Sequence, residues 1–134
     1  MRRMSFVVLA FAVVAFGAMM LSAQDKEMAK SESITGTLVD LKCYAAAGLA
    51  TNDHGSMKGC GEACAKGGLP VALLDANKKV HMLAVPAPAY AMYVGQELRL
   101  TGTHAKNADV FIPEKLEVKD GDKWMEKKLP KTMM

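Results

Sequence analysis

Four residues with metal-binding chemistry lie close together in the sequence: Cys43, His54, Cys60 and Cys64. Cys60 and Cys64 are four positions apart, so a helix would place both thiols on one face. Three thiolates and one imidazole form a Cys3His set, a combination typical of closed zinc sites. Soft thiolates also suit Cu(I), for which Met57 would be a further thioether ligand. The stretch therefore predicts a transition-metal site for zinc or copper.

The odd number of cysteines leaves two other interpretations open. A disulfide between Cys43 and either Cys60 or Cys64 would pin the intervening loop and contribute on the order of 3 kcal/mol. A Cys60–Cys64 bond suits a helix less well, because the two Cβ vectors do not point at each other. The third interpretation is a thiol redox protein, although the sequence has neither a C-x-x-C motif nor a thioredoxin-like βαβ pattern. We find no second catalytic constellation and expect no enzymatic activity.

Other titratable residues are expected to be solvated. Asp40, Asp53 and Glu62 lie near the cysteines in the sequence, but no residue of opposite charge pairs with them in the pattern, so we expect them at the surface. His81 and His104 fall in expected strands without ligand-like neighbours. We therefore predict that both histidines lie on exposed strand faces.

The first 23 residues have the pattern of a secretory signal peptide. Arg2 and Arg3 are followed by the uncharged apolar run Phe6–Leu21, and then by the small residues Ser22 and Ala23. The export machinery recognises three parts of a signal peptide: a basic start, an apolar centre and an end with small residues. We expect cleavage after Ala23, export to the periplasm or the extracellular space, and no stable membrane insertion after cleavage. An uncleaved membrane anchor is the alternative, because the run is about as long as a short spanning helix.

The charge of the expected mature chain argues against nucleic acid as its ligand. The full chain has 17 basic and 14 acidic residues, and removal of Arg2 and Arg3 leaves 15 against 14. Aromatic side chains are few, at 6% of the sequence. Single-stranded nucleic acid is bound by basic grooves with stacking aromatic residues, which this composition does not supply. An unknown envelope protein or a small ligand is the kind of partner that we expect.

The remaining sequence predicts a small all-β domain with short helices. Residues 24–32 are a polar, flexible lead-in, and residues 121–134 are a lysine- and methionine-rich tail. Between them, alternation and turn residues predict strands and helical turns, with a long loop over residues 44–69. The expected strands are Ser33–Lys42, Val71–Leu74, Val80–Val85, Glu97–His104 and Val110–Lys119, and the expected helical turns are Glu62–Lys66 and Ala89–Val94. This order, β-loop-β-β-α-β-β, predicts a five-stranded OB-like barrel over residues 33–120, with the cysteines in the loop that borders the usual binding face.

Three segments resemble a family of small secreted bacterial OB-like proteins of unknown function. The run Gly36-Thr37-Leu38-Val39-Asp40-Leu41-Lys42-Cys43 is similar to the G-x-V-x-D-x-x-C segment of that family. Cys60-Gly61-Glu62-Ala63-Cys64 is similar to its C-x-x-x-C pair, and the run from Gly95 to Gly102 is similar to its G-x-x-V-x-V-x-G segment. The similarity covers roughly residues 34–118. It implies a fold and an exported location, and it implies no activity.

Overall fold

The computed structural model describes residues 30–130, so the expected signal peptide and most of the lead-in lie outside the described residues. The strands are β1 (Glu32–Asp40), β2 (Val71–Leu74), β3 (Val80–Met82), β4 (Glu97–His104), β5 (Phe111–Asp120) and β6 (Lys123–Lys127). The helices are α2 (Leu41–Ala47), α3 (Cys60–Lys66) and α4 (Ala87–Tyr90), followed by the 3-10 turn η2 (Ala91–Tyr93). Within residues 30–130, no helix has the length and apolar character needed to cross a bilayer.

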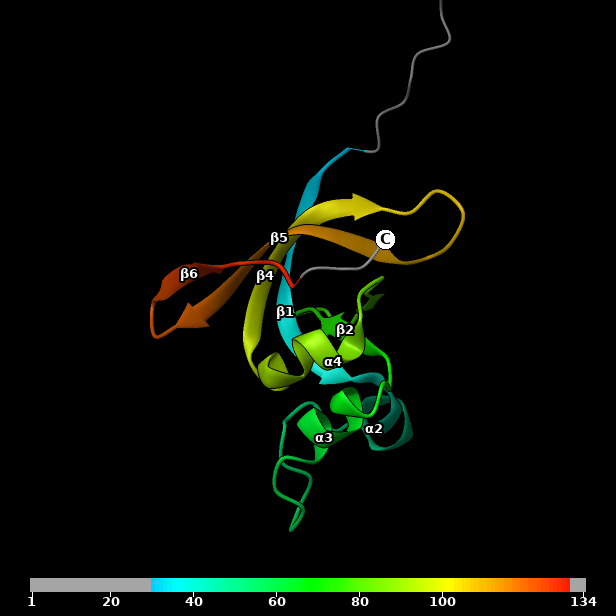
Figure 1. The fold of residues 1–134 in the computed structure, drawn as a ribbon, viewed down its shortest axis with the longest axis vertical. Coiled ribbons are helices and arrows are strands. Elements are labelled where there is room, and N and C mark those ends of the chain that lie inside the picture. The colour runs from blue at the N-terminus through cyan, green and yellow to red at the C-terminus, as the bar shows by residue number, and fades with distance from the viewer. Residues whose placement is uncertain (1–29, 131–134) are drawn as a thin grey trace, which may run out of the picture.

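The strands form one antiparallel sheet in the order β3-β2-β1-β4-β5-β6 (Figure 1). The prediction of a mostly β domain with short helices is confirmed, but the predicted count of five strands is wrong. The sixth strand, β6, lies in the segment that we assigned to the tail, and it pairs with β5 across a turn at Gly121, whose φ is 58°. Three of its five residues are charged and none is buried, so no apolar alternation marks it in the sequence.

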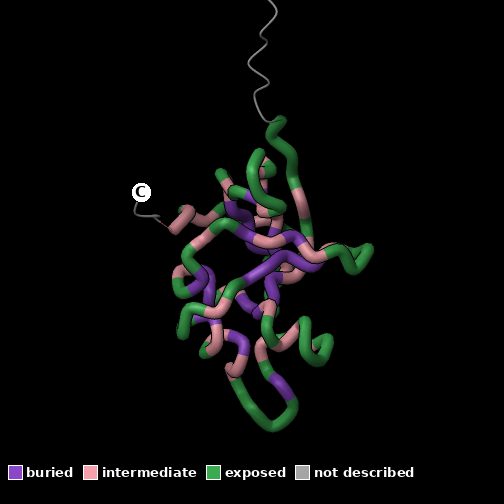
Figure 2. The backbone as a smooth tube through the Cα atoms, turned by 90° about the vertical axis from the view of Figure 1, so that its right-hand side faces the viewer, coloured by how far each residue is buried: buried purple, intermediate pink, exposed green. Residues whose placement is uncertain are grey.

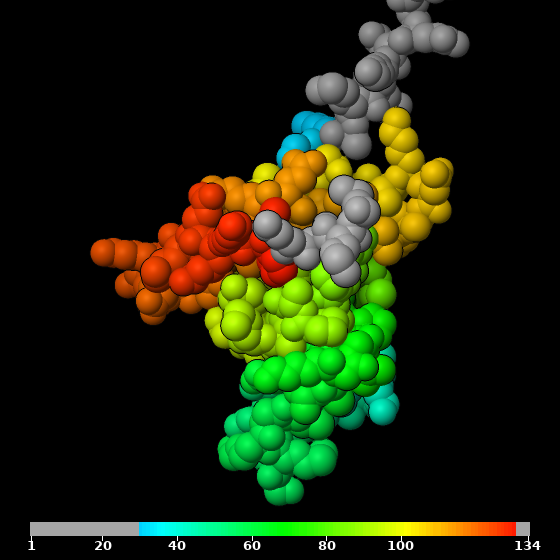
Figure 3. Space-filling model, in the orientation of Figure 1, coloured from blue at the N-terminus to red at the C-terminus, as the bar shows by residue number. Residues whose placement is uncertain are grey.

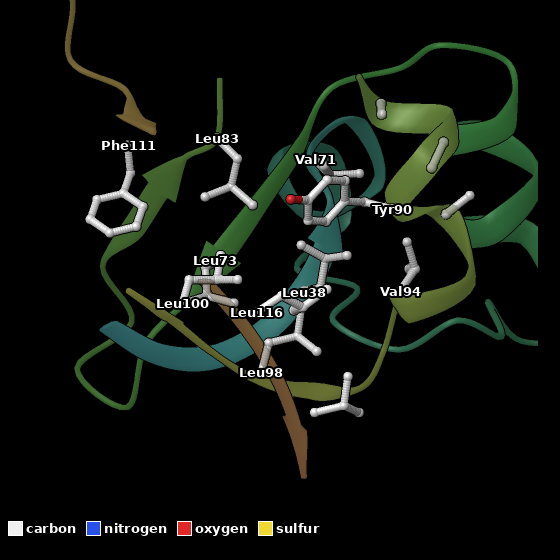
Figure 4. Close-up of a cluster of buried hydrophobic side chains, with 14 residues drawn as sticks. Leu38, Val71, Leu73, Leu83, Tyr90, Val94, Leu98, Leu100, Phe111 and Leu116 are labelled. Atoms are coloured by element: carbon white, nitrogen blue, oxygen red, sulfur yellow. The ribbon is translucent and has the colours of Figure 1, made fainter. Parts of the chain in front are cut away.

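One contact links the β3 end of the sheet to the start of β5. Leu83, directly after β3, forms an isolated parallel bridge with Phe111, and the amide of Ala84 donates to the carbonyl oxygen of Phe111 at 2.9 Å. Figure 4 shows the Leu83 and Phe111 side chains on the same side of the core. The sheet therefore curls so that two distant strands touch, but they touch through a single pair and not through a continuous ladder.

The main core lies on one face of this sheet, under α4 and η2. Leu98 and Leu100 of β4 are fully buried, and Tyr90 of α4 packs against the same cluster (Figure 4). Burial of each leucine contributes about 1.5–3 kcal/mol. Adjacent residues of β1 face opposite ways: Leu38 packs in this core, whereas Val39 packs in a smaller cluster on the other face. Both faces of β1 are therefore covered near its end, so the adjacent residues Leu38 and Val39 are both apolar.

The 30 residues between β1 and β2 are more ordered than the sequence predicted. The expected strand Ser33–Lys42 ends at Asp40, and the first part of the expected loop forms α2. The cause is local, because Oδ1 of Asp40 accepts a hydrogen bond from the amide of Lys42 at 2.9 Å and so caps the helix. Gly48, with φ 68°, ends it. Together with α3 and the loop between them, α2 forms the lower end of the molecule in Figures 1 and 3.

Candidate metal centre

Helix α2 carries Asp40 and Cys43 to the same side of its first turn. Asp40 is the N-cap residue and Cys43 follows three positions later, a spacing that brings two side chains together on a helix. The amide of Leu41 donates to the carbonyl oxygen of Pro70 at 3.0 Å, which ties the start of α2 to the segment that leads into β2. The sheet thus fixes where Cys43 lies, although Cys43 is within helix α2 and does not directly follow a strand, as the expected strand Ser33–Lys42 implied.

The loop over residues 51–59 folds back on itself and positions His54. His54 and Met57 exchange two backbone hydrogen bonds of 3.0 and 3.1 Å, which form a small turn. Oδ1 of Asp53 accepts from the amide of Gly59 at 2.7 Å and closes the loop. His54 is buried between exposed neighbours, and Figure 2 shows a short buried stretch in the exposed loop at the lower end of the molecule. The loop therefore directs one imidazole inward.

Helix α3 presents Cys60 and Cys64 and is held by tight packing at its start. Oδ1 of Asn52 accepts from the amide of Glu62 at 2.8 Å, so the loop that carries His54 also caps this helix. Gly61 is buried, and a Cβ atom on it would lie 2.6 Å from Cγ1 of Val94. Only a residue without a side chain fits this close approach. The expected helical turns Glu62–Lys66 are thus extended to Cys60–Lys66 and anchored to the core through Val94.

The structure brings all four predicted ligand residues together in two overlapping groups. In the first group, the Sγ atoms of Cys43 and Cys60 and a ring nitrogen of His54 lie within 4.8 Å of one another. In the second, the same is true of Cys43 Sγ, Cys64 Sγ and a carboxylate oxygen of Asp40. All three cysteines are unbonded thiols of intermediate burial. Groups of this composition can hold a metal ion.

The hydrogen bonding of His54 leaves one nitrogen free to act as a ligand. Its Nε2 lies 2.8 Å from the carbonyl oxygen of Thr51. A carbonyl oxygen only accepts, so Nε2 carries the proton and the neutral ring has a lone pair on Nδ1. Nδ1 is buried without a hydrogen-bond partner. Metal-bound histidines nearly always donate their other N–H to a carboxylate or backbone carbonyl, which is the arrangement found here.

Asp40 is a residue of the site that sequence reasoning assigned wrongly to the solvated surface. It is only 2% exposed, and its Oδ2 meets no N–H or O–H donor. Hydrogen bonding to this carboxylate, followed by burial, raises the pKa of Cys43 to about 12 and also raises the pKa of Cys64. Both thiols therefore hold their protons at neutral pH until a cation displaces them. The D-x-x-C spacing at a helix start was the signal that could have identified Asp40.

Two acidic residues near the cluster have lysine partners that we did not expect. Asp53 is exposed and pairs with Lys58 at 3.0 Å, and Glu62 is half-buried and pairs with Lys66. His104 is exposed and lies 2.8 Å from Glu32.

The expectation for His81 is wrong. It is buried on β3, where its Nε2 lies 3.1 Å from Oδ2 of Asp75. Asp75 also accepts from the amides of Asn77 and Lys79 in the hairpin turn. His81 therefore belongs to the hairpin and not to the metal cluster.

No protein-family model, no curated protein and no solved structure matches this chain.

Proposed function

We propose that this protein is an exported binding module that holds a transition-metal ion through Cys43, His54 and Cys60, with Cys64 beside them. The fold supports this function by holding two short helices and one loop against the end of a β-sheet, so that ligands from three segments meet. Metal binding in such sites is coupled to stability, because the ion binds the folded arrangement and not the unfolded chain.

The observation that carries the proposal is the pair of buried polar atoms left without partners at the cluster. Within residues 30–130, three buried side-chain nitrogen or oxygen atoms lack a hydrogen-bond partner, and two of them are Nδ1 of His54 and Oδ2 of Asp40. Each such atom costs about 1–3 kcal/mol when it stays unsatisfied. A cation bound to either atom would remove the cost of that atom.

The donor set favours zinc or copper over magnesium or calcium. Thiolates and imidazole are ligands for zinc and for Cu(I), whereas Mg²⁺ and Ca²⁺ take mainly oxygen. Three thiolates and one imidazole fit closed, four-coordinate zinc. A softer site of thiolates alone would favour Cu(I), and Met57 is exposed at 59% in the adjoining turn, where it can supply a thioether to an entering ion.

The alternative is a disulfide-stapled structural barrel that binds an envelope partner. Cys43 lies in both groups, so oxidation would join it to Cys60 or Cys64 and leave one thiol free. A thiol redox function has less support, because reactive thiols need a lowered pKa and the pKa values of Cys43 and Cys64 are raised.

The architecture and location that accompany this function are also proposals. An OB-like barrel is supported by the order of the first five strands, by α4 between β3 and β4, and by the bridge between Leu83 and Phe111. Export is supported by the uncharged run Phe6–Leu21 after Arg2 and Arg3. A partner in the cell envelope follows from that location, and the near-neutral mature chain supports a ligand other than nucleic acid.

Metal analysis combined with a thiol count tests the function directly. The processed protein is recovered from the native envelope without added metal or reductant, and its zinc and copper content is measured per chain. We expect at least one equivalent of metal and three thiols that react only after a chelator is added. Protein with no stoichiometric metal and a single free thiol in denaturant would refute the metal function and support the disulfide alternative.

Two histidine variants supply the matched control. His54→Ala removes a ligand, whereas His81→Ala removes another buried histidine whose Nδ1 also lacks a partner but which lies outside the cluster. We expect His54→Ala to weaken zinc or Cu(I) binding in competition with a chromophoric chelator, and His81→Ala to leave the affinity unchanged. Equal losses in the two variants would show that the effect is structural.

A further inference from the structure

The ligand atoms of the cluster divide into two groups of three that share one residue. Cys43, His54 and Cys60 form one group, and Asp40, Cys43 and Cys64 form the other. The sulfur of Cys43 is the common member. A thiolate sulfur has more than one lone pair, so it can bind two cations at once.

Each group has its own unsatisfied buried atom. His54, whose Nδ1 lacks a partner, is in the first group, and Asp40, whose Oδ2 lacks a partner, is in the second. An ion bound by the first group would satisfy the imidazole. Beyond the Lys42 amide at Oδ1, the Asp40 carboxylate would then have only the weak thiol donor of Cys64, with no N–H or O–H donor at Oδ2. Asp40 is 2% exposed, so water does not readily take that place. The second group therefore needs a cation of its own.

Charge leads to the same conclusion. Once metal binding has displaced the thiol protons, three thiolates and one carboxylate carry four negative charges, and one divalent ion neutralises only two of them. Of the lysines near the cluster, Lys58 contacts Asp53 and Lys66 contacts Glu62. Uncompensated charge in a partly buried site is strongly unfavourable. Two divalent ions neutralise the cluster.

We propose that the cluster binds two divalent ions of the zinc class, bridged by the thiolate of Cys43. One ion is held by Cys43, His54 and Cys60, and the other by Cys43, Cys64 and Asp40. This inference rests on the proposed metal-binding function and extends it to a second position. Asp40 is then a ligand and not only the cap of α2.

Cobalt titration tests the two positions, because Co²⁺ replaces zinc and is visible by spectroscopy. The processed full chain is reduced, freed of metal and titrated without oxygen, and bound ions are counted by native mass spectrometry. We expect thiolate-to-cobalt absorbance to rise up to two equivalents. Since a bridging thiolate couples the two spins, the electron paramagnetic resonance signal of the first ion should decrease as the second binds.

Three variants assign the second position. Asp40→Asn keeps an oxygen that can cap α2, and Cys64→Ser removes a thiol without touching that cap, so a folding defect in one is checked by the other. Both should bind one cobalt ion, with affinity for the second reduced beyond the roughly 10- to 100-fold that loss of an outer-shell partner causes. Glu62→Gln lies between the two cysteines of α3 but outside both groups, and it should still bind two ions.

The outcomes separate this inference from the function on which it rests. A wild-type limit of one ion, lost in His54→Ala, would overturn the second position and leave metal binding intact. Absence of any bound ion would overturn both. Two ions retained in both Asp40→Asn and Cys64→Ser would overturn the assignment of the ligands, and two ions with uncoupled spectra would overturn the bridge.

Discussion

Replacement of Gly61 by alanine should destabilise the fold at the point where α3 meets the core. The new Cβ atom would lie 2.6 Å from Cγ1 of Val94, about 1 Å closer than ordinary contact. Overpacking of this kind costs about 1–3 kcal/mol. The better helix propensity of alanine stabilises the folded state by up to about 1 kcal/mol relative to glycine and offsets part of this cost. We therefore expect a net loss of about 1–2 kcal/mol in the free energy of unfolding.

Urea denaturation of the metal-free, reduced protein measures this change, with circular dichroism and Trp124 fluorescence as probes. The matched control is Gly67→Ala at the C-cap of the same helix. Gly67 has a helical φ of −73°, and a Cβ atom there would meet only carbonyl oxygens of its own helix, at 3.3 and 3.5 Å. The slight crowding is offset by about 0.4–1 kcal/mol of lost chain entropy in the unfolded state. Gly67→Ala should therefore stay within about 0.5 kcal/mol of wild type.

A double variant identifies the responsible contact. Val94→Ala removes the methyl groups that the new Cβ would strike, so Gly61→Ala should be much less harmful in that background. Residues in contact couple by about 0.5–3 kcal/mol, and we expect a favourable coupling of about 1 kcal/mol or more. Additive effects of the two substitutions, or equal stability of Gly61→Ala and Gly67→Ala, would refute the reasoning.

Three further predictions concern the core, the hairpin and export. Leu38→Ala should lower the free energy of unfolding by about 2–5 kcal/mol, because Leu38 is fully buried. Met92 is exposed, so Met92→Ala should change this free energy by less than about 0.5 kcal/mol. Similar urea midpoints for the two variants would contradict the assigned core. The hydrogen bond from His81, followed by those of the turn amides, lowers the pKa of Asp75, so its stabilisation is present above the ordinary aspartate pKa and is lost as pH falls through the lower, folded-state pKa. The stability difference between wild type and Asp75→Asn should therefore shrink below about pH 4, and a difference that is constant with pH would exclude this origin. Intact-mass analysis of envelope protein should give a chain that begins after Ala23, and a mass that includes the apolar run would exclude cleavage.

The sequence predicted well those strands whose burial follows directly from the pattern of apolar and polar residues. The bounds of Glu97–His104 and Val71–Leu74 agree with β4 and β2, because β4 alternates between a buried and an exposed face and β2 is a short apolar run between turns. Proline within a strand is typical of an edge or a bulge, and the register of β4 with β5 shifts opposite Pro113, between Thr101 and Gly102. At these positions, local patterning and backbone preferences were sufficient to predict the structure.

The sequence failed where tertiary contacts decide the environment. Leu41 continues the apolar pattern of β1, so the strand was extended past the residue that in fact caps α2. Asp40 and His81 are polar and look solvated, yet packing from segments far along the chain buries both. The cysteine and histidine pattern identified the ligand residues, but their division into two groups depends on how α2 and α3 lie together, and spacing does not encode that.

The small number of buried side chains in the two site helices has a consequence for dynamics. Helix α2 buries no residue and α3 buries only Gly61 and Ala65, whereas β4 buries Leu98, Leu100 and Gly102. Stability in a protein is not uniform, and segments with few buried contacts open without global unfolding. The amide protons of α2 and α3 should therefore exchange with deuterium through local openings, whereas those of β4 should exchange only when the whole sheet unfolds. A bound ion would join the two helices and slow exchange there alone. The exchange rates of the α2 and α3 amides would therefore show whether the site is occupied.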